Sequence, residues 1–134
     1  MSTKSTHISI AAKNDKAKRY LLEKINDYPE WVTITAFYQA LHMTEAVFAG
    51  DKKIKHSQSH DNRLANLKSD NRYSHLYKHF RPLYSASMVA RYLSADNKEY
   101  SSFTEYLTPD EVLSEIINYR LCEIEKTVET LLKK

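Results

Sequence analysis

The sequence predicts an all-α protein: an antiparallel bundle of four to five helices, formed by a single domain over residues 1–134. Three observations indicate this class. Apolar residues recur at helical spacing over several long stretches. The chain has one glycine and three prolines, too few for the special turns of sandwiches, barrels and dinucleotide folds. Its 42% hydrophobic and 28% charged residues are typical of an ordinary globular domain.

The first predicted helix follows Asn14 or Asp15, either of which can cap it, and extends to about Tyr28. Apolar residues lie on one side of this helix and lysines on the other. We expect residues 1–13, which precede the cap, to be flexible.

The second predicted helix covers residues 30–49 and has little polar surface. A helix that is apolar nearly all round lies in the middle of a bundle or at an interface. Gly50, the single glycine, follows it, and we expect it to end the helix in a left-handed conformation.

The middle of the chain predicts a short helix and a third long one. Ser59 can cap a short helix over residues 60–68. The third long helix begins near residue 70 or 73 and extends to about residue 93. Pro82 lies inside its apolar pattern, which predicts a kink or a break over residues 78–81.

The C-terminal part predicts a loop and one more helix. Residues 95–107 are polar and are expected to form a loop with at most one helical turn. Thr108, Pro109 and Glu111 then form a start signal: an N-cap, a first-turn proline and the partner in a capping box. The last helix continues almost to the end of the chain.

Charge is distributed unevenly along the chain. Residues 51–92 carry nine Lys or Arg and three acidic residues, whereas residues 93–134 carry five basic and nine acidic residues. The basic segment also holds His56, His60, His75 and His79. Such a patch is typical of a site for a polyanion. It is also compatible with a solvated surface that pairs with the acidic C-terminal helix.

The first candidate site surrounds the start of the short helix. Lys55, His56, His60 and Arg63 would lie where free backbone N–H groups already favour an anion. This arrangement predicts a phosphate or nucleotide pocket. Together with His42, the histidines at 56 and 60 could instead bind zinc, a less favoured alternative, and we expect neither a metal nor a cofactor.

The second candidate is a catalytic pair. Cleaving RNA without a metal needs a base such as histidine and a cation that holds the phosphate. Arg72 and His79 lie seven positions apart, on one face of the helix if it is continuous. The alternative is that both belong to the exposed side of a half-buried helix.

The third candidate lies at the end of the third long helix. Tyr84 and Arg91 are seven positions apart, and Tyr92 follows. Arg91 could contact a bound phosphate, or it could hold the bundle in register from a buried position.

Three blocks of sequence resemble the HEPN-like family of helical domains ("higher eukaryotes and prokaryotes nucleotide-binding"). They are residues 31–46, which resemble the second helix of these bundles, His56-x3-His60-x2-Arg63, and Leu83-Tyr84-x2-Ser87-x3-Arg91-Tyr92. The similarity covers roughly residues 14–93 and includes the order of the blocks.

The resemblance implies a four- or five-helix bundle that is often dimeric. Many members are metal-independent ribonucleases of toxin–antitoxin, CRISPR and abortive-infection systems, and others bind nucleotides or lack activity. Active families carry Arg-x4–6-His, and Asn71-Arg72-x6-His79 fits the outer limit of that pattern. In this chain the polar residue precedes the arginine, whereas in many active members it follows.

We therefore expect a homodimer that binds RNA or a nucleotide; the resemblance leaves open whether it is also a metal-independent ribonuclease of a toxin or phage-defence system. The catalytic candidates are Arg72, His79 and His60; the binding candidates are His42, His56, Arg63, Tyr84, Arg91 and Tyr92. The alternative is a non-catalytic protein-interaction module in which residues 31–48 pack against a partner, such as an antitoxin, and the His/Arg cluster is structural. No apolar run is long enough to span a membrane and no secretory signal is visible, so we expect a cytoplasmic protein.

Overall fold

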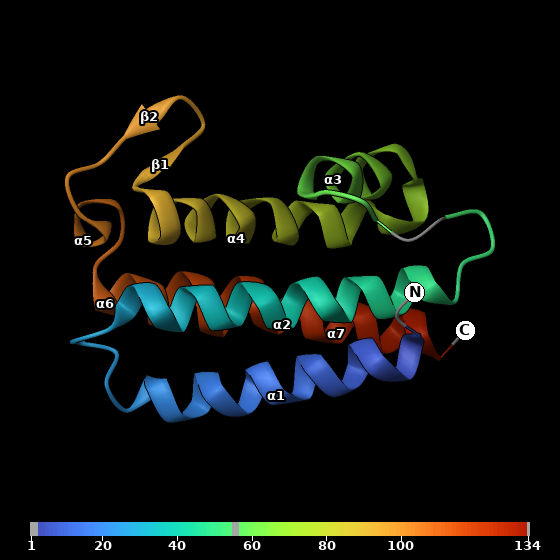
Figure 1. The fold of residues 1–134 in the computed structure, drawn as a ribbon, viewed down its shortest axis with the longest axis horizontal. Coiled ribbons are helices and arrows are strands. Elements are labelled where there is room, and N and C mark those ends of the chain that lie inside the picture. Colours follow the sequence, from blue (N-terminus) through green and yellow to red (C-terminus); the bar gives the residue numbers. More distant parts are fainter. Residues whose placement is uncertain (1–2, 55–56, 134) are drawn as a thin grey trace.

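A computed structural model describes residues 3–54 and 57–133 and confirms the all-α class (Figure 1). Consecutive long helices alternate in direction, so the chain runs back and forth along the bundle. The elements are α1 (Lys4–Leu22), α2 (Pro29–Ala49), α3 (His60–Ser69), η1 (Asn71–Tyr73), α4 (Ser74–Tyr92), β1 (Ser94–Ala95), β2 (Lys98–Glu99), α5 (Phe103–Tyr106), α6 (Pro109–Glu111), η2 (Val112–Leu121) and α7 (Cys122–Leu132).

Helix α1 begins much earlier than the sequence predicted. Thr3, rather than Asn14 or Asp15, is the N-cap, and its side chain accepts a hydrogen bond from the backbone N–H of Thr6. The helix therefore includes most of residues 1–13, which the sequence placed ahead of it. Burial of His7 and Ala11 explains the difference, because contacts with α2 stabilise a segment whose own apolar pattern is weak.

Helix α2 lies in the middle of the bundle, as predicted. It contacts α1, α4 and α7, and Figure 1 shows it between α1 and α4 with α7 behind it. Val32, Ala36, Phe37 and Ala40 are completely buried. The completely buried residues of α2 are thus covered within the same chain, whereas Trp31, near its start, is 53% exposed.

The left-handed residue that ends a helix is not Gly50. Gly50 has φ −90° and lies in the right-handed region, so that prediction is wrong. Leu93, after α4, has φ 58° instead. Its backbone N–H bonds to the carbonyl of Val89 and closes the helix.

Helix α3 begins as predicted, with the Ser59 side chain accepting from the backbone N–H of Asn62. Helix α4 continues without interruption across Pro82. The expected break over residues 78–81 therefore does not occur. Arg72 lies in the 3₁₀ turn η1, ahead of the helix that starts at Ser74. The helical repeat that would place Arg72 and His79 on one face therefore does not extend back to Arg72.

Residues 95–107 hold more structure than the expected polar loop. Strands β1 and β2 pair antiparallel, with Ser94 opposite Glu99. The two residues between them, Asp96 and Asn97, have φ of 53° and 65°, the conformation of a tight hairpin turn that Asp and Asn tolerate. Helix α5 supplies the one predicted helical turn.

The last helix starts with the predicted capping box between Thr108 and Glu111. Residues Val112–Leu121 then form a π-helix, which the sequence did not predict, before α7 resumes the α-helical repeat. Val112, Ile116 and Ile124 reach the core from these two segments. No helix in the part of the chain that the structure describes combines the length and apolar composition that a membrane span requires.

Candidate functional site

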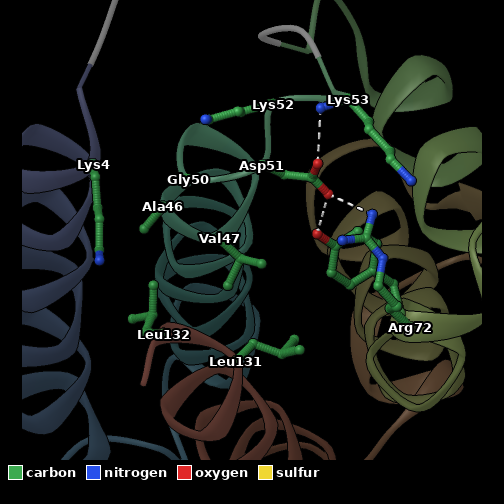
Figure 2. A pocket seen from close by; sticks show the side chains of 11 residues that line it. Lys4, Ala46, Val47, Gly50, Asp51, Lys52, Lys53, Arg72, Leu131 and Leu132 are labelled. Carbon is green, nitrogen blue, oxygen red and sulfur yellow. Dashed lines mark hydrogen bonds and ion pairs between the residues drawn. The ribbon is translucent and has the colours of Figure 1, made fainter. Parts of the chain in front are cut away.

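A cleft opens at one end of the bundle (Figure 2). It lies among the start of α1, the C-terminal ends of α2 and α7, and the η1 turn. Its volume of about 520 Å³ is within the usual range for small-molecule sites, about 300–1,000 Å³. Ala46, Val47, Leu131 and Leu132 give it apolar walls, and the described cationic residues that line it are Lys4, Lys52, Lys53 and Arg72.

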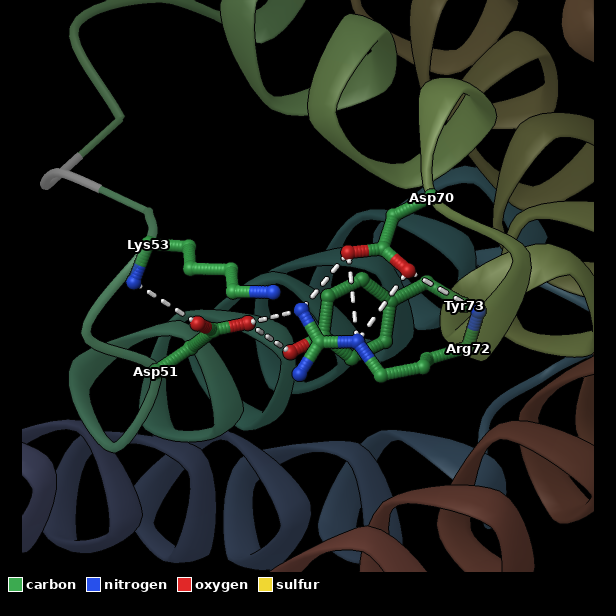
Figure 3. Close-up of polar contacts among 5 residues, drawn as sticks. All are labelled: Asp51, Lys53, Asp70, Arg72 and Tyr73. Atoms are coloured by element: carbon green, nitrogen blue, oxygen red, sulfur yellow. Dashed lines mark hydrogen bonds and ion pairs between the residues drawn. The ribbon is translucent and has the colours of Figure 1, made fainter.

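Arg72 is held in place by two carboxylates (Figure 3). Its Nε and Nη2 donate to Asp70 at 3.1 and 2.6 Å, and Nη2 also donates to Asp51 at 2.7 Å. The Asp70 side chain accepts from the backbone N–H of Arg72 as well, which caps η1. The turn and the ion pairs together fix the direction of the guanidinium, while half of the side chain stays exposed.

Asp51 is the buried anchor of this arrangement, with a side chain only 6% exposed. It accepts from the Tyr73 hydroxyl at 2.5 Å and from the backbone N–H of Lys53 at 2.9 Å. The Tyr73 hydrogen bond is the main cause that lowers the pKa of Asp51. Burial, followed by the bond to Asp51, raises the pKa of Tyr73. Asp51 is thus ionised and Tyr73 protonated at neutral pH.

Positive charge exceeds negative charge at the mouth of the cleft. The side chain of Lys53 extends toward the guanidinium of Arg72 in both close-ups (Figures 2 and 3). Hydrogen bonds to Arg72 lower the pKa of Asp70 to about 2, so both carboxylates near Arg72 remain ionised. Among residues 3–54 and 57–133, no hydrogen bond or ion pair uses Arg72 Nη1. A second anion can therefore be bound without breaking the existing pairs.

His79 does not line the cleft with Arg72. It is buried, its Nδ1 lies 3.2 Å from Nη1 of Arg120, and its ring contacts those of His75 and Tyr119. The described lining of the cleft includes no histidine. The arrangement around Arg72 thus offers cations and an apolar surface, but no described imidazole that could act as base or acid.

Three other predicted residues gather in a second place, between α2 and α3. His60 Nδ1 lies 2.9 Å from Nη1 of Arg63, and Nη2 of Arg63 lies 3.5 Å from the carboxylate of Glu45. His42, one helical turn before Glu45, contacts His7 through Nδ1 atoms 3.0 Å apart. Arg63 and Glu45 are buried, so this cluster is an internal ion pair with histidines around it.

Tyr84 and Arg91 lie beside this cluster, on α4. The ring of Tyr84 packs on that of His60 with centroids 5.5 Å apart. The Arg91 guanidinium donates to the Tyr38 hydroxyl at 3.3 Å and lies 5.2 Å from the ring of Tyr92, which is exposed. His56, the remaining predicted binding residue, lies outside the described residues.

The sequence analysis missed most residues of the cleft. Asp51, Lys52 and Lys53 belong to the basic segment of residues 51–92, in which the sequence analysis singled out other residues. Lys4 was assigned to a flexible segment. The signal that could have found them is the run Gly50-Asp51-Lys52-Lys53, because the C-terminal end of a helix favours nearby cations.

Buried His79 and the half-buried His42 and His60 predict how stability depends on pH. Burial is the main cause that lowers the pKa of His42, His60 and His79 from the ordinary 6.5. Between the folded and the unfolded pKa the unfolded chain binds more protons, so stability falls as pH drops below about 6.5. For buried His79 the slope is at most about 1.4 kcal/mol per pH unit.

Urea unfolding at pH 7.5, 6.5 and 5.5 measures this effect, and we expect the free energy of unfolding to decrease along the series. NMR titration of the imidazole signals shows which histidines cause the loss of stability, because the pKa values of these three in the folded protein should lie below their values in the unfolded chain. Stability that is constant or that rises toward pH 5.5 would contradict the prediction.

Comparisons with protein-family models, with curated proteins and with solved structures give no match.

Proposed function

We propose that this protein is a HEPN-like helical domain that binds a nucleotide or a short single-stranded segment of RNA in the basic cleft. The observation that carries the proposal is the position of Lys53 and Arg72 at the mouth of an apolar cleft, with Arg72 oriented by Asp51 and Asp70. Phosphate is bound by cations in fixed geometry, and bases stack or pack on apolar and aromatic side chains.

The ligand would lie with its phosphate between Lys53 and Arg72 and its base toward Leu131 and Leu132. Lys4 and Lys52 add charge on the other side of the opening. Binding, rather than cleavage, is the chemistry that these described side chains support. The homodimer that the resemblance implies would contain two such clefts.

The test is binding of a fluorescent single-stranded RNA, measured by anisotropy at several salt concentrations. About three phosphate contacts give a log–log slope near −2, so raising salt from 50 to 200 mM should weaken binding roughly 20-fold. Arg72→Ala should lower the affinity and reduce the slope by about 0.7, as expected for the loss of one contact. Lys53→Ala should have a similar effect.

Arg81→Ala is the matched control, because Arg81 is also paired with an aspartate, Asp96, at 2.6 Å but does not line the cleft. Its RNA affinity should equal that of the parent protein. A mononucleotide should displace the RNA at lower concentration than inorganic phosphate, since only the nucleotide contacts the apolar walls. Binding that ignores salt, or that Arg81→Ala weakens as much as Arg72→Ala, would refute the proposal.

A further inference from the structure

A second group of side chains, all of them potential metal ligands, lies where α4 meets the start of α7. His75 and His79 are one helical turn apart on α4, and Glu123 faces them from α7. One ligand atom from each of the three lies within 4.8 Å of the others. None of these residues lines the basic cleft, so an inference drawn here is independent of the proposed function.

The spacing of these groups is close to that of a metal site. Zinc binds imidazole nitrogen and carboxylate oxygen at about 2.0–2.2 Å, which places neighbouring ligand atoms of a tetrahedral site about 3.3–3.6 Å apart. Nε2 of His75 and Oε2 of Glu123 are 3.7 Å apart. The rings of His75 and His79 have centroids 4.8 Å apart and stand edge to face. The three ligand atoms lie within 4.8 Å of one another, so side-chain rotations that bring them about 1 Å closer would complete the geometry.

The burial of the three residues suits a site that remains open on one side. His79 is buried, whereas the side chains of His75 and Glu123 are 54% and 33% exposed. An ion bound to all three would face solvent on the side of His75. Three protein ligands with one position left for water are typical of reactive zinc sites, whereas structural zinc sites are closed by four protein ligands.

The π-helix η2 sets the surroundings of His79. Helices of this type are rare, and their single-turn form within α-helices is frequent at functional sites. Near the end of η2, Tyr119 packs its ring against His79, and Arg120 places Nη1 3.2 Å from His79 Nδ1. Arginine only donates hydrogen bonds, so Nδ1 of His79 accepts from Arg120 and Nε2 of the neutral ring carries the proton. A metal ion that binds the neutral ring at either nitrogen therefore requires Arg120 to release Nδ1. The positive charge of Arg120 also competes with a bound cation.

We propose that His75, His79 and Glu123 form a binding site for a divalent transition-metal ion of the zinc class, which links α4 to α7. Two imidazoles and one carboxylate suit zinc, cobalt, iron or nickel, whereas magnesium and calcium prefer oxygen ligands. Binding would fix the two helices against each other, so the ion would stabilise the folded chain by an amount that grows with the logarithm of its concentration above the Kd.

Zinc and cobalt titrations of the whole protein test the site. The thermal midpoint should rise with added Zn²⁺, and Co²⁺ should give visible absorption bands that Zn²⁺ removes. Glu123→Gln and His75→Ala should each weaken zinc binding at least about tenfold, since even the loss of an outer-shell partner costs that much. Both positions are partly exposed, so the variants should fold. Arg120→Met should strengthen binding, because it removes the competing charge.

Glu129→Gln is the matched control: Glu129 lies on the same helix, is 71% exposed and is absent from the cluster. Its zinc affinity should equal that of the parent. Three results would overturn the inference: zinc affinity that neither Glu123→Gln nor His75→Ala changes, magnesium binding as tight as zinc binding, or no zinc-dependent shift in the midpoint at 1 mM.

Discussion

Replacing Glu45 by alanine is expected to lower the free energy of unfolding by about 3–5 kcal/mol, because it leaves the buried guanidinium of Arg63 without its counter-charge. The side chains of Arg63 and Glu45 are only 8% and 2% exposed. Burial lowers the pKa of Arg63, and Glu45 opposes that effect. Nε of Arg63 has no hydrogen-bond partner among the described residues, so water would have to enter the site to solvate the unpaired charge. Urea unfolding measures the loss.

A double replacement separates the cost of an unpaired charge from the value of the pair. Glu45→Met combined with Arg63→Met removes both charges and keeps apolar volume, which is often neutral or stabilising for buried pairs. We expect the double variant to be at least about 2 kcal/mol more stable than Glu45→Ala. If Glu45→Ala lost less than about 1 kcal/mol, the ion pair would not be a buried interaction of the kind described.

Replacing Phe37 by alanine is expected to cost about 3–5 kcal/mol of stability, the usual loss when a buried phenylalanine is truncated and a cavity remains. Phe37 is completely buried on α2. Its ring contacts those of Phe80 and Tyr84 on α4 and of His60 on α3, with centroids 5.6–5.8 Å apart. The substitution would therefore loosen three helices at one point, which thermal or urea unfolding would detect.

Trp31→Ala is the control for this variant. Trp31 lies on the same helix and is larger, but it is 53% exposed, and substitutions at exposed positions usually change stability by no more than about 0.5 kcal/mol. A loss for Trp31→Ala equal to that for Phe37→Ala would mean that truncation of any aromatic residue in α2, rather than burial of Phe37, determines the effect.

Most of the fold could be predicted from local signals. The Ser59 cap, the Thr108 capping box and the apolar character of α2 each depend on residues close together in sequence, and the structure confirms them. The start of α1 could not be predicted in this way, since contacts with α2 stabilise it. The continuity of α4 across Pro82 likewise depends on tertiary packing that outweighs a local preference.

The candidate site was less accessible to sequence reasoning. Arg72 was identified as a phosphate-binding residue, but the other residues that line the cleft come from the end of α2, the residues after it, the start of α1 and the end of α7, which only the folded chain brings together. His79 was assigned to the same site on the assumption of one continuous helix. The 3₁₀ turn at Asn71–Tyr73 changes the direction of Arg72, and His79 instead contacts the C-terminal π-helix.

The position of the last helix has a consequence for synthesis on the ribosome. Segments η2 and α7 supply Val112, Ile116, Leu121, Ile124 and Val128 to the core, and they pack against both α2 and α4. A nascent chain that has not yet released these residues leaves apolar sides of α2 and α4 uncovered, a state prone to aggregation. Cooperative closure must therefore await the emergence of η2 and α7 from the ribosome, and termination before residue 109 would yield a species that chaperones must retain or proteases remove.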